Sequence, residues 1–253
     1  MPRFDRPRLR ETRLQRAERL ADAYGLVLFL ILVTFVVMMT LPPEGWAGRF
    51  TAVVVACLTA VVALTSSNVA AGRVRVAVVA SVVAIACSVL AKLLDSQPVL
   101  GAAFAIATVL LAVAAGTILR RVLRAERVEF RTILGAVSVF TLLGLLFGFA
   151  FAALGRLKGG SVFAGGGAER TSDYMFFSYT TLTTTGYGNL VPAGQIGQSL
   201  AVFEMLVGQI FLVTLVAGLV SLWRPGSGLA GPAAGRADTE SVEDTVPRPG
   251  DRG

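Results

Sequence analysis

The stretch that decides the fold is Thr181-Leu-Thr-Thr-Thr-Gly-Tyr-Gly-Asn-Leu-Val-Pro-Ala193. It places hydroxyl side chains and two glycines between apolar segments, a composition that would be unusual inside a membrane-spanning helix. Gly186 and Gly188 have no Cβ, so their backbone can adopt left-handed conformations that turn carbonyl groups toward one axis. Tyr187 between them can point away from that axis and pack, while Thr184 adds a hydroxyl group at one end. Such a backbone can replace the water shell of a dehydrated cation with carbonyl oxygens.

A short helix is expected directly before this stretch, over residues 173–182. It would be about 15 Å long, too short to cross the roughly 30 Å of hydrocarbon in a bilayer. Thr171, Ser172 and Asp173 are suitable N-caps for it. Its carbonyl end would point toward the glycines, where the helix dipole favours a cation. Because non-helical backbone at membrane depth must be buried in protein or line a water-filled path, we expect a re-entrant helix and loop.

These residues resemble the selectivity filter of potassium channels, which commonly reads Thr-Thr-Val-Gly-Tyr-Gly. The matching residues are Thr183, Thr184, Thr185, Gly186, Tyr187 and Gly188, with Thr185 in place of the usual valine. The resemblance implies potassium sites formed by the carbonyl groups of residues 184–187 and by the Thr184 hydroxyl, with Gly188 completing the segment. It also implies a homotetramer, since one chain contributes one filter strand.

Two positions near the filter depart from the family pattern. Asn189 stands where many potassium channels have aspartate, and Thr180 offers no carboxylate to replace it. The acidic network that often braces the outer filter mouth is therefore expected to be altered, and inactivation behaviour cannot be carried over. The residues expected to support the filter are Thr183, Asn189, Glu204 and Thr180.

The composition indicates a membrane protein. The chain has 253 residues, of which 55% are hydrophobic and 15% charged, and its mean hydropathy is +0.71, well above that of a soluble domain. About 20 apolar residues are needed to cross a bilayer, and six segments have roughly that length: 24–41, 50–70, 74–94, 99–119, 132–154 and 196–223. A tight turn at residues 71–73 separates the second and third. We predict an all-α membrane protein with six transmembrane helices and the re-entrant helix and filter between the fifth and sixth.

Arginine residues are concentrated on one side of the predicted spans. They fill the segment 1–22, flank the turn after the second span and recur in the linker 120–131. The opposite loops, 42–49 and 95–98, are short and poor in Arg and Lys. The positive-inside rule therefore places both termini of this multi-pass plasma-membrane protein in the cytoplasm and the filter mouth outside. Anionic lipid headgroups are expected as partners of the basic segments, with a plain solvated tail as the alternative for 1–22.

Residues 23–119 have the four-span layout of a voltage sensor but lack its charges. A sensor needs arginines at every third position within the fourth span, and residues 99–119 contain no charged side chain. Three arginines with that spacing follow the span: Arg121, Arg124 and Arg127. We interpret 120–131 as a basic linker helix on the cytoplasmic membrane surface. A sensor displaced toward the cytoplasm is the alternative.

The pore domain is predicted over residues 132–223, followed by a tail at 224–253 whose Gly, Pro, Ala and acidic residues are typical of disorder. The glycine-rich segment 155–172 suits a flexible extracellular loop. Gly208 lies where the inner helix of similar channels has a glycine hinge, although a close helix contact explains a glycine there equally well. Residues expected to line the cavity and inner pore follow on the same helix: Gln209, Leu212, Val216 and Val220.

Glu204 is a carboxyl residue inside the predicted sixth span, and an ionisable group at that depth indicates a role with a specific partner. We expect it to be protonated or hydrogen-bonded and packed behind the short helix against Ser178, Tyr179 or Thr181, where it would hold the filter in place. The alternative is a pH-sensitive gating element.

The sequence offers few residues for metal binding or catalysis. The chain has no histidine, which excludes a histidine metal site or an imidazole base. Cys57 and Cys87 fall inside predicted spans, where they are expected to pack as small apolar residues. We therefore predict no enzyme, no cofactor other than potassium as the permeant ion, and no nucleic-acid partner.

The resemblance predicts a homotetrameric, potassium-selective channel with passive conduction and no arginine voltage sensor. One alternative is a weakly selective cation channel, because some Gly-Tyr-Gly filters admit sodium. The other is a potassium transporter or a non-conducting channel-like subunit. Transporters with related pore loops usually repeat the unit four times in one chain and keep a single filter glycine, whereas this chain has one copy with two glycines.

Overall fold

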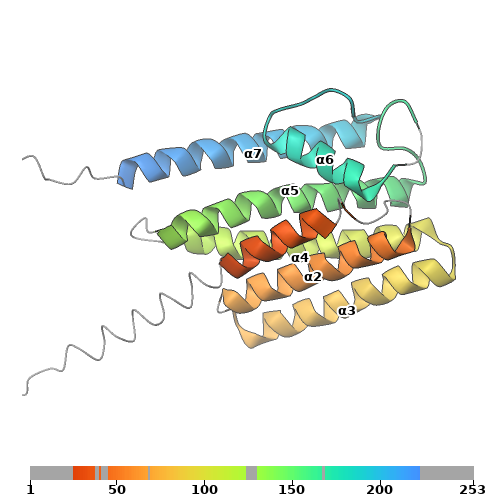
Figure 1. Ribbon diagram of the computed structural model, residues 1–253, viewed down its shortest axis with the longest axis horizontal. Coiled ribbons are helices and arrows are strands. Elements are labelled where there is room, and N and C mark those ends of the chain that lie inside the picture. The colour runs from red at the N-terminus through yellow and green to blue at the C-terminus, as the bar shows by residue number, and fades with distance from the viewer. Residues whose placement is uncertain are drawn as a thin grey trace, which may run out of the picture. The chain divides into compact units, whose positions relative to one another are not determined.

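The computed structural model describes residues 25–37, 40, 45–67, 69–123, 130–166 and 169–222, and these parts of the chain are helical apart from short connections (Figure 1). The predicted segments 1–22 and 224–253 lie outside the described residues. The helices are Gly25–Val37, α2 (Trp46–Ser66), α3 (Ala71–Leu93), α4 (Gln97–Leu123), α5 (Phe130–Lys158), α6 (Thr171–Leu182) and α7 (Gln195–Leu222).

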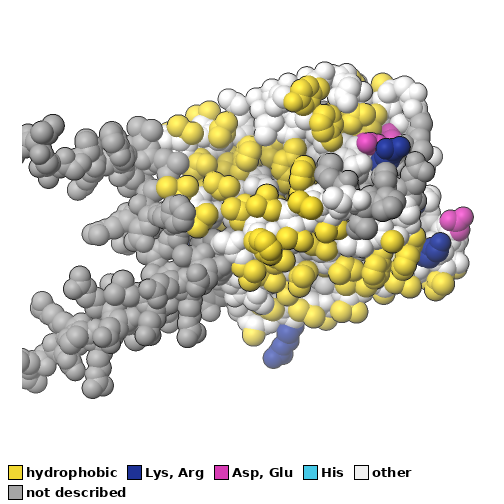
Figure 2. All heavy atoms as spheres, viewed as in Figure 1, with side chains coloured by type: hydrophobic (Ala, Val, Ile, Leu, Met, Phe, Trp, Pro, Cys, Tyr) yellow, Lys and Arg dark blue, Asp and Glu magenta, His cyan; other side chains and the backbone are white. Residues whose placement is uncertain are grey.

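Five of these helices, α2 to α5 and α7, are long and apolar enough to cross a membrane. Hydrophobic side chains spread along the sides of the helices, while charged side chains lie near their ends on the face shown in Figure 2. The prediction of an all-helical membrane protein is confirmed for the described residues. The first predicted span, 24–41, is described mainly as the helix Gly25–Val37, so the count of six spans stays a prediction.

Two predicted boundaries differ from the structure. The turn between the second and third spans lies at residues 67–70, so the prediction of a turn at 71–73 was wrong. Ser67 folds back onto the last turn of α2, with its amide 3.2 Å from the Leu64 carbonyl oxygen and its hydroxyl 2.7 Å from that of Ala63. The predicted linker 120–131 begins as a continuation of α4 up to Leu123, and residues 124–129 lie outside the description.

Small residues allow α2 and α4 to pack closely in the four-helix part. The buried alanines on these helices are Ala52, Ala56, Ala60, Ala63, Ala103, Ala107, Ala114 and Ala115. Without the hydrophobic driving force that water provides, membrane helices associate through such close packing. At the end of α4, Arg121 donates to the carbonyl oxygen of Ser66 at 3.3 Å and so caps the C-terminus of α2.

Helix α5 lies between this four-helix part and α7 (Figure 1). On one side it contacts α4, where the rings of Phe104 and Phe149 have centroids 5.3 Å apart. On the other side it contacts α7 through Phe147 and Phe203, with centroids 6.0 Å apart. The central position of α5 joins the four preceding helices to α6 and α7 of the same chain.

Three glycines on α5 form a groove that receives α6. A Cβ added at Gly144 would lie 2.5 Å from the ring of Tyr179, and one at Gly148 would lie 2.4 Å from the sulfur of Met175. At Gly155 the added carbon would lie 2.5 Å from the hydroxyl oxygen of Tyr174. The absence of side chains along this face of α5 therefore lets the short helix approach closely enough to be buried.

We predict that Gly144→Ala destabilises the protein by about 1–3 kcal/mol, the usual range for overpacking. The Tyr179 ring has little freedom to move because its hydroxyl donates to the Thr141 carbonyl oxygen at 2.8 Å. Gly116→Ala in α4 is the matched control, since a Cβ there meets no atom within 4 Å and alanine favours a helix by about 0.5–1 kcal/mol. Thermal unfolding in detergent measures both. Equal midpoints for the two variants would contradict the groove.

Candidate pore loop

Helix α6 confirms the predicted short helix over 173–182, but it starts earlier and its cap differs. The N-cap is Arg170, not Thr171, Ser172 or Asp173 as predicted. Asp173 acts from the third helical position, where its carboxylate accepts the backbone N–H of Arg170 at 2.9 Å. An acidic residue in the first turn can satisfy the N-cap amide in this way and also complements the helix dipole.

The backbone after α6 has positive φ angles at alternate residues. They are 57° at Thr184, 52° at Gly186 and 79° at Gly188, whereas Thr185 and Tyr187 have no positive φ. In an extended strand successive carbonyl groups point to opposite sides, but alternation between left-handed and right-handed conformations turns them to the same side. Glycine adopts positive φ without penalty, while Thr184 does so at a steric cost of about 1–2 kcal/mol. The segment therefore has the backbone pattern of a row of carbonyl ligands.

The amide groups at the start of this segment bind the end of α6. The carbonyl oxygen of Thr180 accepts two N–H groups, from Thr185 at 2.8 Å and from Gly186 at 3.1 Å. The hydroxyl of Thr183 donates to the Tyr179 carbonyl oxygen at 2.7 Å and lies 2.9 Å from the Thr185 hydroxyl. Since the last carbonyls of a helix lack partners within the helix, these bonds fix the segment to α6 while its own carbonyls stay available.

The far side of the segment is held by an aromatic contact and by the loop before α6. The ring of Tyr187 stacks on that of Phe176, with centroids 5.7 Å apart and planes 11° apart. Residues 162–164 pair with residues 191–193 through two backbone bonds, Ala164 N–H to the Val191 oxygen at 2.8 Å and Ala193 N–H to the Val162 oxygen at 2.6 Å. The expectation that loop 155–172 is simply flexible was therefore wrong for this part of it.

Phe163 explains why the loop is ordered there. Its side chain is buried, with ring centroids 5.1 Å from Phe177 and 5.6 Å from Tyr174 on α6. Burial of an aromatic ring on the helix offsets the entropy lost by a glycine-rich loop. Composition alone did not predict this order, because burial of the single Phe163 ring stabilises a loop that its glycines would otherwise leave flexible.

Glu204 on α7 is fully buried and contacts Ser178 on α6, one of the three partners expected from the sequence. The Ser178 hydroxyl oxygen lies 2.5 Å from Oε1 of Glu204 and 2.7 Å from the carbonyl oxygen of Gly144 on α5. A hydroxyl group has one proton to donate, and a carbonyl oxygen can only accept. Both contacts can be hydrogen bonds together only if Glu204 is protonated and donates to Ser178. The three helices then share one chain of hydrogen bonds, Glu204 to Ser178 to Gly144.

Gly208 lies one helical turn after Glu204 and packs against the end of α6. A Cβ added there would lie 2.6 Å from the carbonyl oxygen of Leu182 and 2.8 Å from its Cδ1. Helix α7 is assigned as continuous α-helix through this position, from Gln195 to Leu222. The contact gives Gly208 a packing role, and its role as a hinge stays a prediction.

The remaining predicted residues whose side chains are described are exposed in the single chain. Residues 183–189, including Asn189, are all exposed, and Tyr187 is 70% exposed despite its stacking contact. On α7, Gln209, Leu212 and Val216 are exposed, while the side chain of Val220 lies outside the description. Only 17% of the most apolar part of α7 is buried. Residues 183–189 are therefore uncovered in the single chain, and so is a large apolar surface on α7.

Sequence reasoning missed Gly144 and Gly148, which bring α6 close to α5. Their spacing of four residues on an apolar helix is a recognised signal for close helix packing. It also missed Arg156, a cation in the last turn of α5, at the end of the bundle for which the positive-inside rule predicts few basic residues.

The geometry defines a class of protein: a membrane protein in which a short helix and a carbonyl-bearing segment lie between two spanning helices. Residues 136–224 match the protein-family model described as "Ion channel". This part of the chain is therefore the pore domain of an ion channel and not of an enzyme. No curated protein matches the chain.

We predict that Ser178→Ala destabilises the pore domain by about 1–3 kcal/mol, because it leaves buried oxygens of Glu204 and Gly144 without their shared partner. Glu204→Gln is expected to be close to neutral, since its amide N–H can donate to Ser178 as the carboxylic acid does. Ser88→Ala is the control, because this buried serine bonds only to Ile85 of its own helix. Thermal midpoints in detergent measure all three. A Glu204→Gln midpoint as low as that of Ser178→Ala would contradict the protonated state.

We also predict that Gly208→Ala lowers the thermal midpoint and reduces ion flux, because the added carbon displaces Leu182 and with it the base of the filter segment. The control is again Gly116→Ala. A variant with unchanged midpoint but a lower open probability would instead support the hinge.

Proposed function

We propose that four copies of this chain form a potassium-selective channel that conducts K⁺ passively across the plasma membrane. The observation that carries the proposal is the alternation of positive φ at Thr184, Gly186 and Gly188. A row of carbonyl oxygens of this kind can substitute for the hydration shell of K⁺, with the Thr184 hydroxyl as a further ligand. The ion-binding residues proposed are 184–188.

The exposed surfaces support assembly into a tetramer. One chain supplies one carbonyl row, which by itself leaves a dehydrated ion open on its other sides. The exposed filter segment and the apolar face of α7 would both be covered around a fourfold axis. In such an assembly Gln209, Leu212, Val216 and Val220 are proposed to face the ion path, because their spacing places them on one side of the helix.

Support of the filter is proposed to come from two directions. The Thr180 carbonyl oxygen accepts the amides of Thr185 and Gly186, and the Thr183 hydroxyl lies 2.9 Å from that of Thr185. Glu204 fixes α6 to α7 through Ser178. Asn189 is exposed, and we propose that it takes its support from a neighbouring chain.

Gating by an arginine voltage sensor does not fit this chain. Residues 99–119 on α4 contain no charged side chain, and Arg121 caps α2, a contact that would be lost if it moved through the field. We propose that both termini are cytoplasmic, as the arginine distribution predicts, and that the basic segments at 1–22 and 120–131 contact anionic lipid headgroups.

The proposal is tested by purifying the full chain, reconstituting it in liposomes and measuring reversal potentials under potassium and sodium gradients. We expect reversal near the potassium equilibrium potential. Gly186→Ala is expected to lose most of the K⁺ flux, because alanine disfavours positive φ by about 1–2 kcal/mol. Gly165→Ala is the matched control, since Gly165 also has positive φ, 102°, but lies outside the filter.

Other results would identify the alternatives. Comparable sodium permeability would indicate a weakly selective cation channel, and flux that saturates or needs a coupled ion would indicate a transporter. Absence of flux from a protein whose native mass corresponds to four chains would indicate a non-conducting subunit. Current that depends on pH in the wild type but not in Glu204→Gln would support pH-sensitive gating through Glu204.

A further inference from the structure

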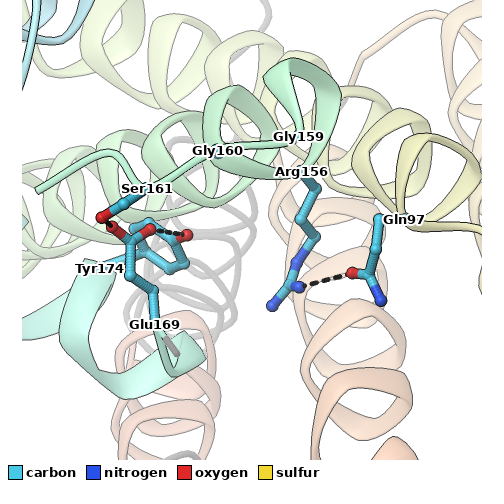
Figure 3. Close-up of a pocket in the computed structure, with 8 residues that line it drawn as sticks. Gln97, Arg156, Gly159, Gly160, Ser161, Glu169 and Tyr174 are labelled. Atoms are coloured by element: carbon cyan, nitrogen blue, oxygen red, sulfur yellow. Dashed lines mark hydrogen bonds between the residues drawn. The ribbon is translucent and has the colours of Figure 1, made fainter. Parts of the chain in front are cut away.

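A polar pocket of about 310 Å³ lies at the end of the bundle where α5 leaves the membrane-spanning region (Figure 3). Its walls come from three parts of the chain: Gln97 at the start of α4, Arg156 in the last turn of α5, and the loop and α6 residues that follow. Gly159 and Gly160 line it without side chains, and a Cβ at either would meet no atom within 4 Å. The pocket is therefore open on the side of this loop.

Arg156 is a charged residue of this pocket, and part of its guanidinium group has no hydrogen-bond partner. The residue is only 8% exposed, and its guanidinium lies over the Phe104 ring at 5.2 Å from the centroid. Its Nη1 donates to Oε1 of Gln97 at 3.2 Å. Its Nε and Nη2 are buried and have no hydrogen-bond partner. These two nitrogens form one edge of the guanidinium group, which is the edge that binds two oxygens of an oxyanion side by side.

The acidic residue of the pocket, Glu169, attracts Arg156 through its charge but accepts no hydrogen bond from the Nε or Nη2 of that arginine. Glu169 accepts hydrogen bonds from the Ser161 hydroxyl, the Phe163 N–H and the Tyr174 hydroxyl. Figure 3 shows this cluster on one side of the pocket, with Arg156 and Gln97 together on the other. The carboxylate is therefore committed to the loop and α6.

A second guanidinium increases the local excess of positive charge. Arg49, near the start of α2, lies close enough for its charge to oppose that of Arg156, and its Nε is also buried without a partner. Burial of a cation with unsatisfied donors costs several kcal/mol unless an anion accepts from them. The two positively charged guanidinium groups thus leave three buried nitrogen atoms without a hydrogen-bond acceptor.

We propose that this pocket binds a phosphate-type oxyanion, held by the Nε and Nη2 edge of Arg156, with Gln97 at its rim. The first turn of α4 begins at Gln97, and the positive end of its helix dipole favours an anion there. Arg156 and Gln97 mark the ends of two membrane-spanning helices, so the pocket lies at the depth of lipid headgroups. The phosphate group can come from an anionic phospholipid or from free inorganic phosphate.

The first test compares the thermal midpoint of the purified full chain in sodium phosphate and in sodium chloride of equal ionic strength. Binding to the folded state raises the midpoint in proportion to the logarithm of ligand concentration. Arg156→Gln is expected to weaken the apparent affinity by about tenfold or more. Lys158→Gln, an exposed cation two residues further along α5, is the matched control and is expected to respond like the wild type.

A second variant keeps the test decisive if Arg156→Gln does not fold. Gln97→Glu places a carboxylate beside Arg156 at the position of the present Gln97 contact. We expect it to raise the midpoint in chloride and to abolish the response to phosphate, because the carboxylate supplies the missing negative charge. A Gln97→Glu protein that responds to phosphate as the wild type does would overturn the proposal.

The source of the phosphate group is distinguished by adding short-chain phosphatidylglycerol or phosphatidylcholine to the same variants. A response to phosphatidylglycerol alone that requires Arg156 assigns the site to a lipid headgroup, and a response to inorganic phosphate alone assigns it to the free ion. Responses to both show that the phosphate group is sufficient. The proposal is overturned if neither ligand stabilises the wild type beyond chloride or phosphatidylcholine, or if Arg156→Gln responds as the wild type does.

Discussion

The pore domain depends on one constraint: the backbone after Leu182 stops being helical inside a protein that lies in a membrane. Every carbonyl and amide group there needs a partner, because the hydrocarbon provides none. In this segment the backbone amide groups and the backbone carbonyl groups are satisfied in different ways. The amides of Thr185 and Gly186 are bound by the Thr180 carbonyl, which ties the segment after α6 to the end of that helix. Positive φ at Thr184, Gly186 and Gly188 is a pattern that can turn the carbonyl groups of this segment to a common side, where they could bind another ligand.

The surrounding helices serve to hold α6 in place. Glycines at 144, 148 and 155 let it sit against α5, and Gly208 lets α7 approach the carbonyl of Leu182. One polar contact, Glu204 to Ser178 to Gly144, joins all three helices at the level of this packing. A protonated carboxyl group suits that position because it can donate a hydrogen bond without bringing a buried charge. Small residues and the contact between Glu204 and Ser178 together fix α6, the short helix before residues 183–189.

Charge appears in the structure mainly where the helices end. Arg121 caps α2 at one end of the bundle. At the other end Arg156 stands over Phe104 with one edge of its guanidinium unused. Arg121 donates to a carbonyl oxygen at the end of a helix, whereas Arg156 has more hydrogen-bond donors than there are acceptors around it. This difference separates a structural arginine from one that points to a ligand.

The sequence by itself determined the membrane class, most helix positions, and the short helix α6 with the non-helical segment that follows it. These follow from local properties: apolar length, the conformational freedom of Gly186 and Gly188, and the hydroxyl side chains before them. It also named Ser178 among the partners of Glu204, since only a few polar groups were near enough in the expected topology.

The tertiary structure alone decided the Arg170 cap, the turn at 67–70, the pairing of residues 162–164 with 191–193, and the pocket at Arg156. Each of these depends on residues distant in sequence or on the competition between neighbouring caps and turns, which composition and spacing do not encode.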